Sequence, residues 1–444
     1  MTATRPKLSW SDLPGARVGV WGLGREGLAN VRKLCAIGTQ PVLVDDRPQA
    51  VAINGLPVLG TGYGGLAALE KCDVVVKSPG ISRYREEVVR LEDRGVAVAG
   101  GLGLWLQEAD PARALLITGT KGKSTTAAVT GHLLNGLGHR CLVGGNIGQP
   151  PWDPEGAPGP WDFWVIEVSS YQAMDLPCSP PVVAVTSLHP DHLDWHGGVQ
   201  NYYRDKLSAC SQPGADLTVA NGDSDLLRER VSQLGPRVDW VHAADDPDAS
   251  WMEPLGLLGG HNRRNALIAR RCLRALGVAG ASDEGALRAA AGGFRHLDHR
   301  LQVVGDVAGV TFVDDSLSTN VLPTLAALDA FPGRRVALIA GGHDRGIDYA
   351  PLADGLRDRA APTLVLTLPD SGVRIHAELD RAGRVNAEDC TDLDAAVARA
   401  FDWARPDGVV LLSPAAPSFG RFRDYRERGE AFSRAMQTCA ATVN

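Results

Sequence analysis

Short apolar runs rich in valine, isoleucine and leucine recur along the chain and alternate with alanine-rich segments of helical character. Within each run the apolar residues are nearly continuous, as in strands that are buried on both faces of a sheet. Because such strands alternate with helices, the pattern predicts an α/β fold with mainly parallel sheets. The candidate strands are residues 17–22, 41–46, 73–78, 96–100, 114–119, 163–170, 182–187, 217–222, 310–315, 335–342, 363–368 and 408–414.

With 444 residues, the chain suits about three domains. We expect one boundary near residue 101, ahead of a strand that leads into a glycine-rich loop, and a second near residue 302. The predicted domains are therefore 1–101, 102–301 and 302–444, with the outer two smaller. A proline- and glycine-rich stretch at 149–162 is expected to form a surface loop of the middle domain.

Composition and charge narrow the class of protein without identifying it. Apolar residues make up 44% of the chain and charged residues 22%, as in ordinary globular proteins. The net charge of −7 disfavours a nucleic-acid partner, and no segment resembles a signal peptide or a membrane span. The eight cysteines are scattered without a C-x-x-C pair, which favours free thiols in a reducing compartment over a zinc site. We therefore expect a cytoplasmic monomer with small-molecule partners.

The first motif with chemical content is GLGREG at 22–27, directly after a predicted strand. Its glycines suit a tight turn and the close approach of a pyrophosphate to a helix N-terminus. Asp45 and Asp46 close the next predicted strand, where dinucleotide-binding folds place a ribose-binding acid. Taken alone, the motif leaves open a Rossmann turn without a cofactor and, less favoured, a dehydrogenase.

A second glycine-rich loop, ITGTKGKSTT, occupies 117–126. The commonest spacing of a phosphate-binding loop would require glycine where Ile117 stands. Strand, loop and alanine-rich helix nevertheless come in the required order, so that backbone N–H groups can surround the phosphates of ATP. Lys123 supplies a mobile positive charge and Ser124 a hydroxyl for Mg²⁺. The loop therefore predicts ATP binding.

Polar side chains in and after two later strands could complete a metal site. Glu167 lies inside an apolar strand, where a carboxylate is costly unless it is paired or bound to a metal. Beside a phosphate loop, a Mg²⁺ ligand is the favoured interpretation over a structural ion pair. His192 follows the strand 182–187 without the helical spacing of a zinc protease, and it suits a place near Mg²⁺ and phosphate. Lys206, taken alone, reads as a solvated lysine.

Three further features point to ligands. Asn262 and Asn265 share one face of a predicted helix and could contact a purine, although helix capping is the alternative. Small, polar and basic residues follow three apolar strands of the third domain, where open α/β sheets bind ligands. Arg345 and Arg421 are available there for carboxylates. The strand-end segments are 313–320, 340–346 and 411–429.

Taken together and in this order, these motifs resemble those of the Mur ligase family, the ATP-dependent amino-acid ligases of peptidoglycan assembly. The pattern is most similar to the branch that adds glutamate to UDP-N-acetylmuramoyl-L-alanine through an acyl phosphate, with release of ADP and phosphate. The family implies a Rossmann-like UDP-binding domain, a central ATP-binding domain and a Rossmann-like amino-acid-binding domain. Besides the two glycine loops, the matching segments are 78–82, 144–148, 167–172, 189–197, 261–265, 299–300, 314–320 and 411–429.

The resemblance also implies roles for matching residues. Lys123, Glu167, His192 and Lys206 are expected to be catalytic. Two Mg²⁺ ions are expected, with ligands among Ser124, Glu167, His192 and Lys206, a lysine that the family carbamylates. The expected UDP-substrate contacts are Gly24, Arg25, Glu26, Asp45, Asp46, Arg47, Ser78, Gly80, Asn146 and His192. The expected ATP contacts are Gly119, Thr120, Lys121, Gly122, Lys123, Ser124, Thr125, Asn262, Asn265, Arg300 and Asp315. The expected glutamate contacts are Thr319, Arg345, Ser418 and Tyr425.

Four positions depart from the pattern usual for D-glutamate addition. Lys121 replaces a common asparagine, Leu317 a usual lysine and Tyr425 a frequent phenylalanine, and Arg345 stands near the family's glutamate-binding lysine. Because an ammonium and a planar guanidinium hold carboxylates differently, we favour L-glutamate as the amino acid, with D-glutamate as the alternative. Remoter alternatives are a P-loop NTPase that is not a ligase and a folate polyglutamating enzyme, against which the GLGREG segment argues.

Overall fold

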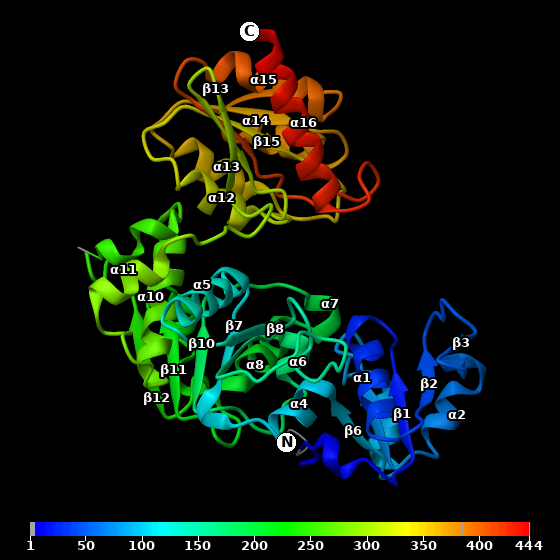
Figure 1. Ribbon diagram of the computed structural model, residues 1–444. Helices are drawn as coiled ribbons and strands as arrows, with labels where there is room; N and C mark the ends of the chain where they lie inside the picture. The colour runs from blue at the N-terminus through cyan, green and yellow to red at the C-terminus, as the bar shows by residue number, and fades with distance from the viewer. Residues whose placement is uncertain (1–4, 248, 384, 444) are drawn as a thin grey trace. The chain divides into compact units, whose positions relative to one another are not determined.

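The computed structural model describes residues 5–247, 249–383 and 385–443. It contains three six-stranded sheets, most of whose strand pairs are parallel (Figure 1), which confirms the predicted α/β class. The chain divides into two compact units. The first contains the N-terminal and central sheets, and the second contains the C-terminal sheet together with residues 256–263. None of the described helices is long and apolar enough to cross a membrane.

The N-terminal sheet has the strand order β3-β4-β2-β1-β5-β6. Its strands are β1 (Val18–Trp21), β2 (Val42–Asp45), β3 (Ala52–Ile53), β4 (Leu56–Gly60), β5 (Val74–Lys77) and β6 (Ala97–Gly100). Its helices are α1 (Arg25–Ala36), α2 (Leu66–Leu69) and α3 (Glu86–Asp93). Helix α1 packs on one face of the sheet, and α2 and α3 pack on the other. Because β1 pairs with β2 on one side and β5 on the other, the loops after these strands diverge, and such a point is where open sheets bind ligands.

The central sheet is wholly parallel, in the order β12-β11-β10-β7-β9-β8. Strand β7 lies inside it and every residue of β7 is buried, as the continuous apolar pattern predicts. The strands are β7 (Ala114–Thr118), β8 (Cys141–Gly145), β9 (Phe163–Glu167), β10 (Val182–Val185), β11 (Leu217–Asn221) and β12 (Arg237–Val241). The helices of this part of the chain are α4 (Gly101–Leu106), α5 (Lys123–Gly136), α6 (Ser170–Ala173), α7 (Leu193–His196), α8 (Val199–Leu207), α9 (Asp225–Arg228), α10 (Gly260–Ala275) and α11 (Glu284–Ala291).

The C-terminal sheet has the order β13-β14-β18-β15-β16-β17, with only β13 antiparallel to its neighbour. Helices α12, α13 and α14 bury one face of the sheet, and α15 and α16 bury the other. The strands are β13 (Gln302–Val307), β14 (Val310–Asp314), β15 (Val336–Ala340), β16 (Thr363–Thr367), β17 (Asn386–Asp389) and β18 (Val409–Leu412). The helices are α12 (Val321–Leu328), α13 (Ala350–Arg357), α14 (Ser371–Ala382), α15 (Leu393–Ala404) and α16 (Tyr425–Val443).

The strands missing from the sequence-based prediction are mostly at sheet edges. Strands β8 and β12 border the central sheet, and β13 and β17 border the C-terminal sheet. Edge strands have fewer neighbours to bury them, so they can carry polar residues and glycine, as in the segment NAED of β17. Their apolar pattern is therefore too weak to identify them.

Candidate active site

The glycine-rich loop between β7 and α5 is fastened to the end of β10. The N–H groups of Thr120 and Lys121 donate to the carbonyl and the hydroxyl of Ser187, each at 2.8 Å. Thr186 Oγ1 donates to the Lys121 carbonyl at 2.6 Å. Gly122 has φ +90°, and a Cβ there would lie 2.7 Å from Asn265 Oδ1, so only glycine fits. The loop thus presents the N-terminus of α5, a site suited to phosphate groups.

Glu167, at the end of β9, is 1% exposed and is held by two neutral donors. Ser124 Oγ donates to Glu167 Oε2 at 2.6 Å, and Asn146 Nδ2 donates to Oε1 at 2.7 Å. A buried carboxylate that is hydrogen-bonded to neutral groups still favours a nearby cation. The arrangement therefore fits a Mg²⁺ ion bound through Ser124 and Glu167, hard oxygen ligands of the kind that Mg²⁺ prefers.

Lys206 is not a solvated lysine, contrary to the interpretation of that residue taken alone. Its side chain on α8 is buried, 3% exposed, and Nζ donates to the Gly119 carbonyl at 3.0 Å. The ammonium lies 5.1 Å from the centre of the Tyr202 ring. Burial, together with Lys123, holds the pKa of Lys206 well below its usual value. Burial thus favours the neutral amine of Lys206 at this place beneath the phosphate loop.

The histidine-rich segment after β10 separates into an exposed and a buried part. The side chain of His192 is 53% exposed, and its ring lies 5.2 Å from that of Tyr171. His196 is fully buried between the Asp205 carboxylate, at 2.7 Å, and the Ser170 hydroxyl, at 2.9 Å. His196 is thus a structural residue. Among the described residues, no cluster of three or more His, Cys, Asp or Glu side chains is arranged to hold a metal ion.

Lys121 has a local partner that the sequence does not reveal. Its ammonium lies 3.7 Å from Asp191 Oδ2. This contact joins the phosphate loop to the histidine-rich segment.

A cavity of about 410 Å³ lies at the carboxyl ends of the N-terminal strands. Its lining comprises most residues expected to contact the UDP substrate, but Arg47, Asn146 and His192 are not among them. The lining residues are Gly22, Leu23, Gly24, Arg25, Glu26, Asp45, Asp46, Ser78, Pro79, Gly80 and Ile81.

Two lining residues of this cavity also contact the central part of the first unit. The Arg25 guanidinium donates to the carbonyls of Gly145, Asn146 and Gly148 at 2.7–3.2 Å. It therefore holds the loop that carries Asn146. Glu26 accepts a hydrogen bond of 2.6 Å from Gln172 Nε2, and burial raises the pKa of Glu26 to about 7.

The candidates of the second unit gather at the carboxyl ends of β14, β15 and β18. Asp315 accepts hydrogen bonds from Ser413 Oγ at 2.7 Å and from the Leu301 N–H at 3.1 Å, and burial raises its pKa to about 7. Arg345 lies 3.5 Å from the Thr319 carbonyl. Ser418 is buried in the loop after β18. The strand ends thus bring together side chains that are far apart in the sequence.

The remaining candidates, Tyr425, Asn262 and Asn265, are divided between the two units. Tyr425 begins α16, and its ring lies 5.7 Å from that of His299. Asn262, in the second unit, donates to the Leu258 carbonyl at 3.0 Å, whereas Asn265 belongs to the first unit. A hydrogen bond of 2.6 Å between His299 Nδ1 and Asp314 Oδ2 was not predicted, because it depends on the fold around Gly429.

Family models match three parts of the chain. Residues 16–100 match the Mur ligase MurD-like N-terminal domain, 117–273 the Mur ligase middle domain, and 299–416 the Mur ligase glutamate ligase domain.

Similar proteins cover almost the entire chain. One from a Micromonospora strain, named UDP-N-acetylmuramoyl-L-alanine–L-glutamate ligase, is 43% identical over 97% of this chain and 98% of its own. A second of that name, from Xanthomonas euvesicatoria, is 38% identical over 95% of each chain. Among solved structures, the UDP-N-acetylmuramate–alanine ligase of Thermotoga maritima matches with a TM-score of 0.56 at 19% identity, over 96% of this chain and 100% of that chain. The MurF ligase of the same organism, solved with ADP, matches with a TM-score of 0.55 at 14% identity, over 96% and 97%.

Proposed function

This chain belongs to the Mur ligase family and is an ATP-dependent ligase, and we propose that it joins L-glutamate to UDP-N-acetylmuramoyl-L-alanine in peptidoglycan precursor synthesis. The observation that carries the proposal is the 43% identity, over nearly both full lengths, to a relative named for that reaction. The phosphate loop and the cavity lined by the GLGREG segment support it, because one suits ATP and the other a second phosphate-bearing substrate. D-glutamate is the alternative amino acid.

The alanyl carboxylate of the substrate is a poor acylating agent, so the proposed reaction first activates it. The alanyl carboxylate attacks the γ-phosphorus of ATP, the bond to ADP breaks, and an acyl phosphate results. The amine of glutamate then attacks the acyl carbon, and the tetrahedral intermediate collapses to an amide and inorganic phosphate. In this scheme Lys123, whose Nζ lies 3.1 Å from the Thr120 carbonyl on the loop, offsets the charge on the transferring phosphoryl group.

Magnesium would be held by Ser124, Glu167, His192 and carbamylated Lys206, and two ions are proposed. When bound, Mg²⁺ supplies charge neutralisation and fixes the phosphate oxygens. In its neutral form, the buried amine of Lys206 can react with CO₂, forming an N–C bond and releasing a proton, which gives an anionic carbamate. The low pKa of Lys206 supports this step, because only the neutral amine is a nucleophile.

Glutamate is proposed to bind at the strand ends of the second unit, through Thr319, Arg345, Ser418 and Tyr425. Arg345 and Thr319 are in contact there, and Ser418 is buried in the neighbouring loop. Leu317 offers no charge where a lysine is usual in the D-glutamate pattern. The carboxylate of glutamate would then be oriented by the guanidinium of Arg345 and not by a lysine ammonium. Because the two groups hold carboxylates differently, this difference supports L-glutamate as the substrate.

The deciding experiment supplies UDP-N-acetylmuramoyl-L-alanine, ATP and Mg²⁺ with either L- or D-glutamate. Phosphate release and the product mass are measured for each enantiomer. We expect product with L-glutamate and at least about tenfold lower kcat/KM with D-glutamate. A misoriented amino acid that raises the activation free energy by about 1.4 kcal/mol is enough for that ratio. Product with D-glutamate alone would reverse the stereochemical proposal. ATP turnover that is independent of both amino acids would favour a non-ligase NTPase.

A pH effect on substrate binding is expected from Glu26. Its pKa of about 7 means that it is protonated below neutral pH and charged above it. Glu26 lines the cavity proposed for an anionic diphosphate, so its carboxylate should repel the ligand at high pH. Affinity for UDP-N-acetylmuramoyl-L-alanine should therefore fall about tenfold from pH 6 to pH 8.5, which corresponds to about 1.4 kcal/mol of binding free energy. Calorimetric titration of wild type and Glu26→Gln tests this expectation. The variant should show a flat profile, and an unchanged slope would contradict the assignment.

A further inference from the structure

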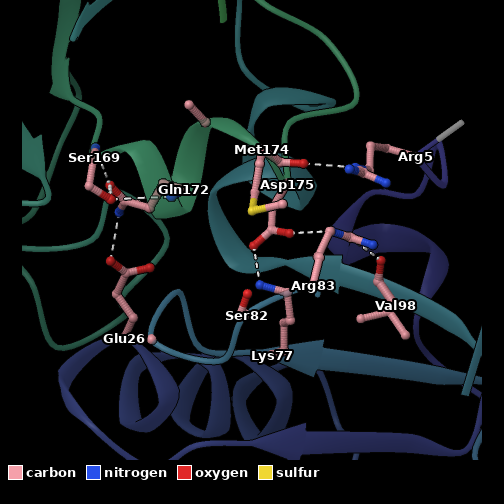
Figure 2. A network of polar contacts seen from close by, with 12 residues as sticks. Arg5, Glu26, Lys77, Ser82, Arg83, Val98, Ser169, Gln172, Met174 and Asp175 are labelled. Carbon is pink, nitrogen blue, oxygen red and sulfur yellow. Dashed lines mark hydrogen bonds and ion pairs between the residues drawn. The ribbon is translucent and has the colours of Figure 1, made fainter. Parts of the chain in front are cut away.

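Asp175, two residues after α6, is the centre of a buried ionic cluster in the first unit (Figure 2). Its Oδ2 lies 2.5 Å from the Lys77 ammonium, and its Oδ1 accepts a hydrogen bond from Arg83 Nε. Lys77 is 0% exposed and Asp175 is 4% exposed. Burial alone would raise the pKa of Asp175, but Lys77 and Arg83 hold it below its usual value. The cluster is therefore an ionised group of one carboxylate between two cations.

The two cations stand at opposite ends of one loop of the proposed nucleotide-sugar cavity. Lys77 is the last residue of β5, Arg83 follows Ser82, and the loop between them contributes Ser78, Pro79, Gly80 and Ile81 to the lining. One carboxylate of the central part of the chain thus binds both ends of a loop of the N-terminal part. Arg83 is fixed further by the Val98 carbonyl at 2.7 Å and by Glu92 at 2.5 Å.

The stretch that carries Asp175 begins at the phosphate site. Glu167 contacts Ser124 of the phosphate loop, and five residues later Gln172 donates to Glu26 in the cavity wall, as Figure 2 shows for the latter contact. The stretch 167–175 therefore touches the phosphate site at one end and two walls of the cavity at the other.

Stability alone does not account for this cluster. Removing three charged groups from water is costly, and a well-packed apolar replacement would often be as stable. What a buried ion group can provide is one defined arrangement of the segments that it joins. Another pair, Arg32 of α1 with Asp153 at 2.5 Å, already joins the same two parts without touching the loop 78–82.

We propose that Asp175 is a positioning residue, which holds both ends of the loop Ser78–Ser82 and so sets the shape of the nucleotide-sugar cavity and its distance from the phosphate loop. The identity of the nucleotide sugar rests on the proposed function, but the role of Asp175 does not.

The test compares Asp175→Asn with Asp153→Asn in the full-length protein. Asp175→Asn keeps the shape of the side chain but leaves Lys77 without its carboxylate and Arg83 with Glu92 alone. We expect KM for UDP-N-acetylmuramoyl-L-alanine to rise at least tenfold in Asp175→Asn, with KM for ATP within twofold of wild type. Asp153→Asn should leave both KM values within twofold. Equal changes in the two variants, or equal changes in both KM values of Asp175→Asn, would overturn the proposal.

Two further measurements keep the test decisive. Hydrogen exchange of backbone amides in 78–82 should be at least tenfold faster in Asp175→Asn, and unchanged exchange would overturn the proposal even without an assay of activity. If Asp175→Asn does not fold, the double variant Lys77→Met with Asp175→Leu removes opposite charges together, and the same faster exchange and higher KM are expected. If wild type makes no product with either glutamate, the proposed function fails. The role of Asp175 is still tested by hydrogen exchange and by calorimetric titration of UDP, whose affinity for Asp175→Asn should be lower than for wild type.

Discussion

Replacing Glu167 by glutamine is expected to lower kcat by about 10²–10³-fold, the loss typical of removing one group that stabilises transition-state charge. The reason lies in the surroundings of this carboxylate. It is buried, its two hydrogen-bond donors are the neutral groups of Ser124 and Asn146, and it borders the phosphate loop. A glutamine has nearly the same shape but offers one oxygen instead of two and no charge, so it is a poor partner for Mg²⁺.

The same substitution is expected to leave the apoprotein at least as stable as wild type. Burying a charge without a cation is costly, and glutamine removes that cost. Thermal unfolding without Mg²⁺ and with Mg²⁺ plus ADP provides the measurement. Mg²⁺ plus ADP should raise the unfolding temperature of wild type, and should raise that of Glu167→Gln much less. A variant that unfolds at a lower temperature in both conditions would point to a structural ion pair instead of a metal ligand.

The second large effect is expected for Lys206→Ala, with a loss of kcat of about 10²-fold or more. Lys206 is buried under the phosphate loop, and its pKa is held well below the usual value, which favours the neutral amine that reacts with CO₂. If its carbamate is the working group, then alanine removes a carboxylate and leaves a space where one had been. Acetate or propionate at millimolar concentration should then restore part of the activity.

A matched control for this variant lies on the same helix. Gln200 is an exposed residue of α8, and Gln200→Ala should keep wild-type kcat and show no response to acetate. Activity of Lys206→Ala at the wild-type level would refute the carbamate role. Loss of activity without rescue, in a variant that still binds ATP and keeps its unfolding temperature, would indicate that the lysine acts as an amine.

Local patterns in the sequence were sufficient for the class of fold and for the phosphate site. The continuous apolar segments became buried parallel strands such as β7 and β10. The order of strand, glycine loop and helix predicted the loop between β7 and α5, because the strand, the glycine turn and the helix N-terminus that form it are adjacent in the sequence. Glu167 was predicted inside the strand 163–170, whereas in the structure β9 ends at Glu167, which meets Ser124 at the edge of the sheet.

The roles of several charged residues could not be read in the same way. Arg25 was predicted as a ligand contact and lines the cavity, and the sequence did not reveal that its guanidinium also donates to carbonyls about 120 residues further along the chain, at Gly145, Asn146 and Gly148. Lys206 appeared solvated and is buried. Lys77, Arg83 and Asp175 carried no pattern at all, because nothing close to them in the sequence shows that they meet.

The sequence by itself thus determined most interior strands and the strand–glycine loop–helix unit of β7 and α5, since these depend on periodicity and on neighbouring residues. Only the tertiary structure decided which charges are buried, which partners they have and which loops they join. The physical reason is that the cost of a buried charge depends on the groups packed around it. For Asp175 and its two cations, those groups come from segments about 90–100 residues apart in the chain.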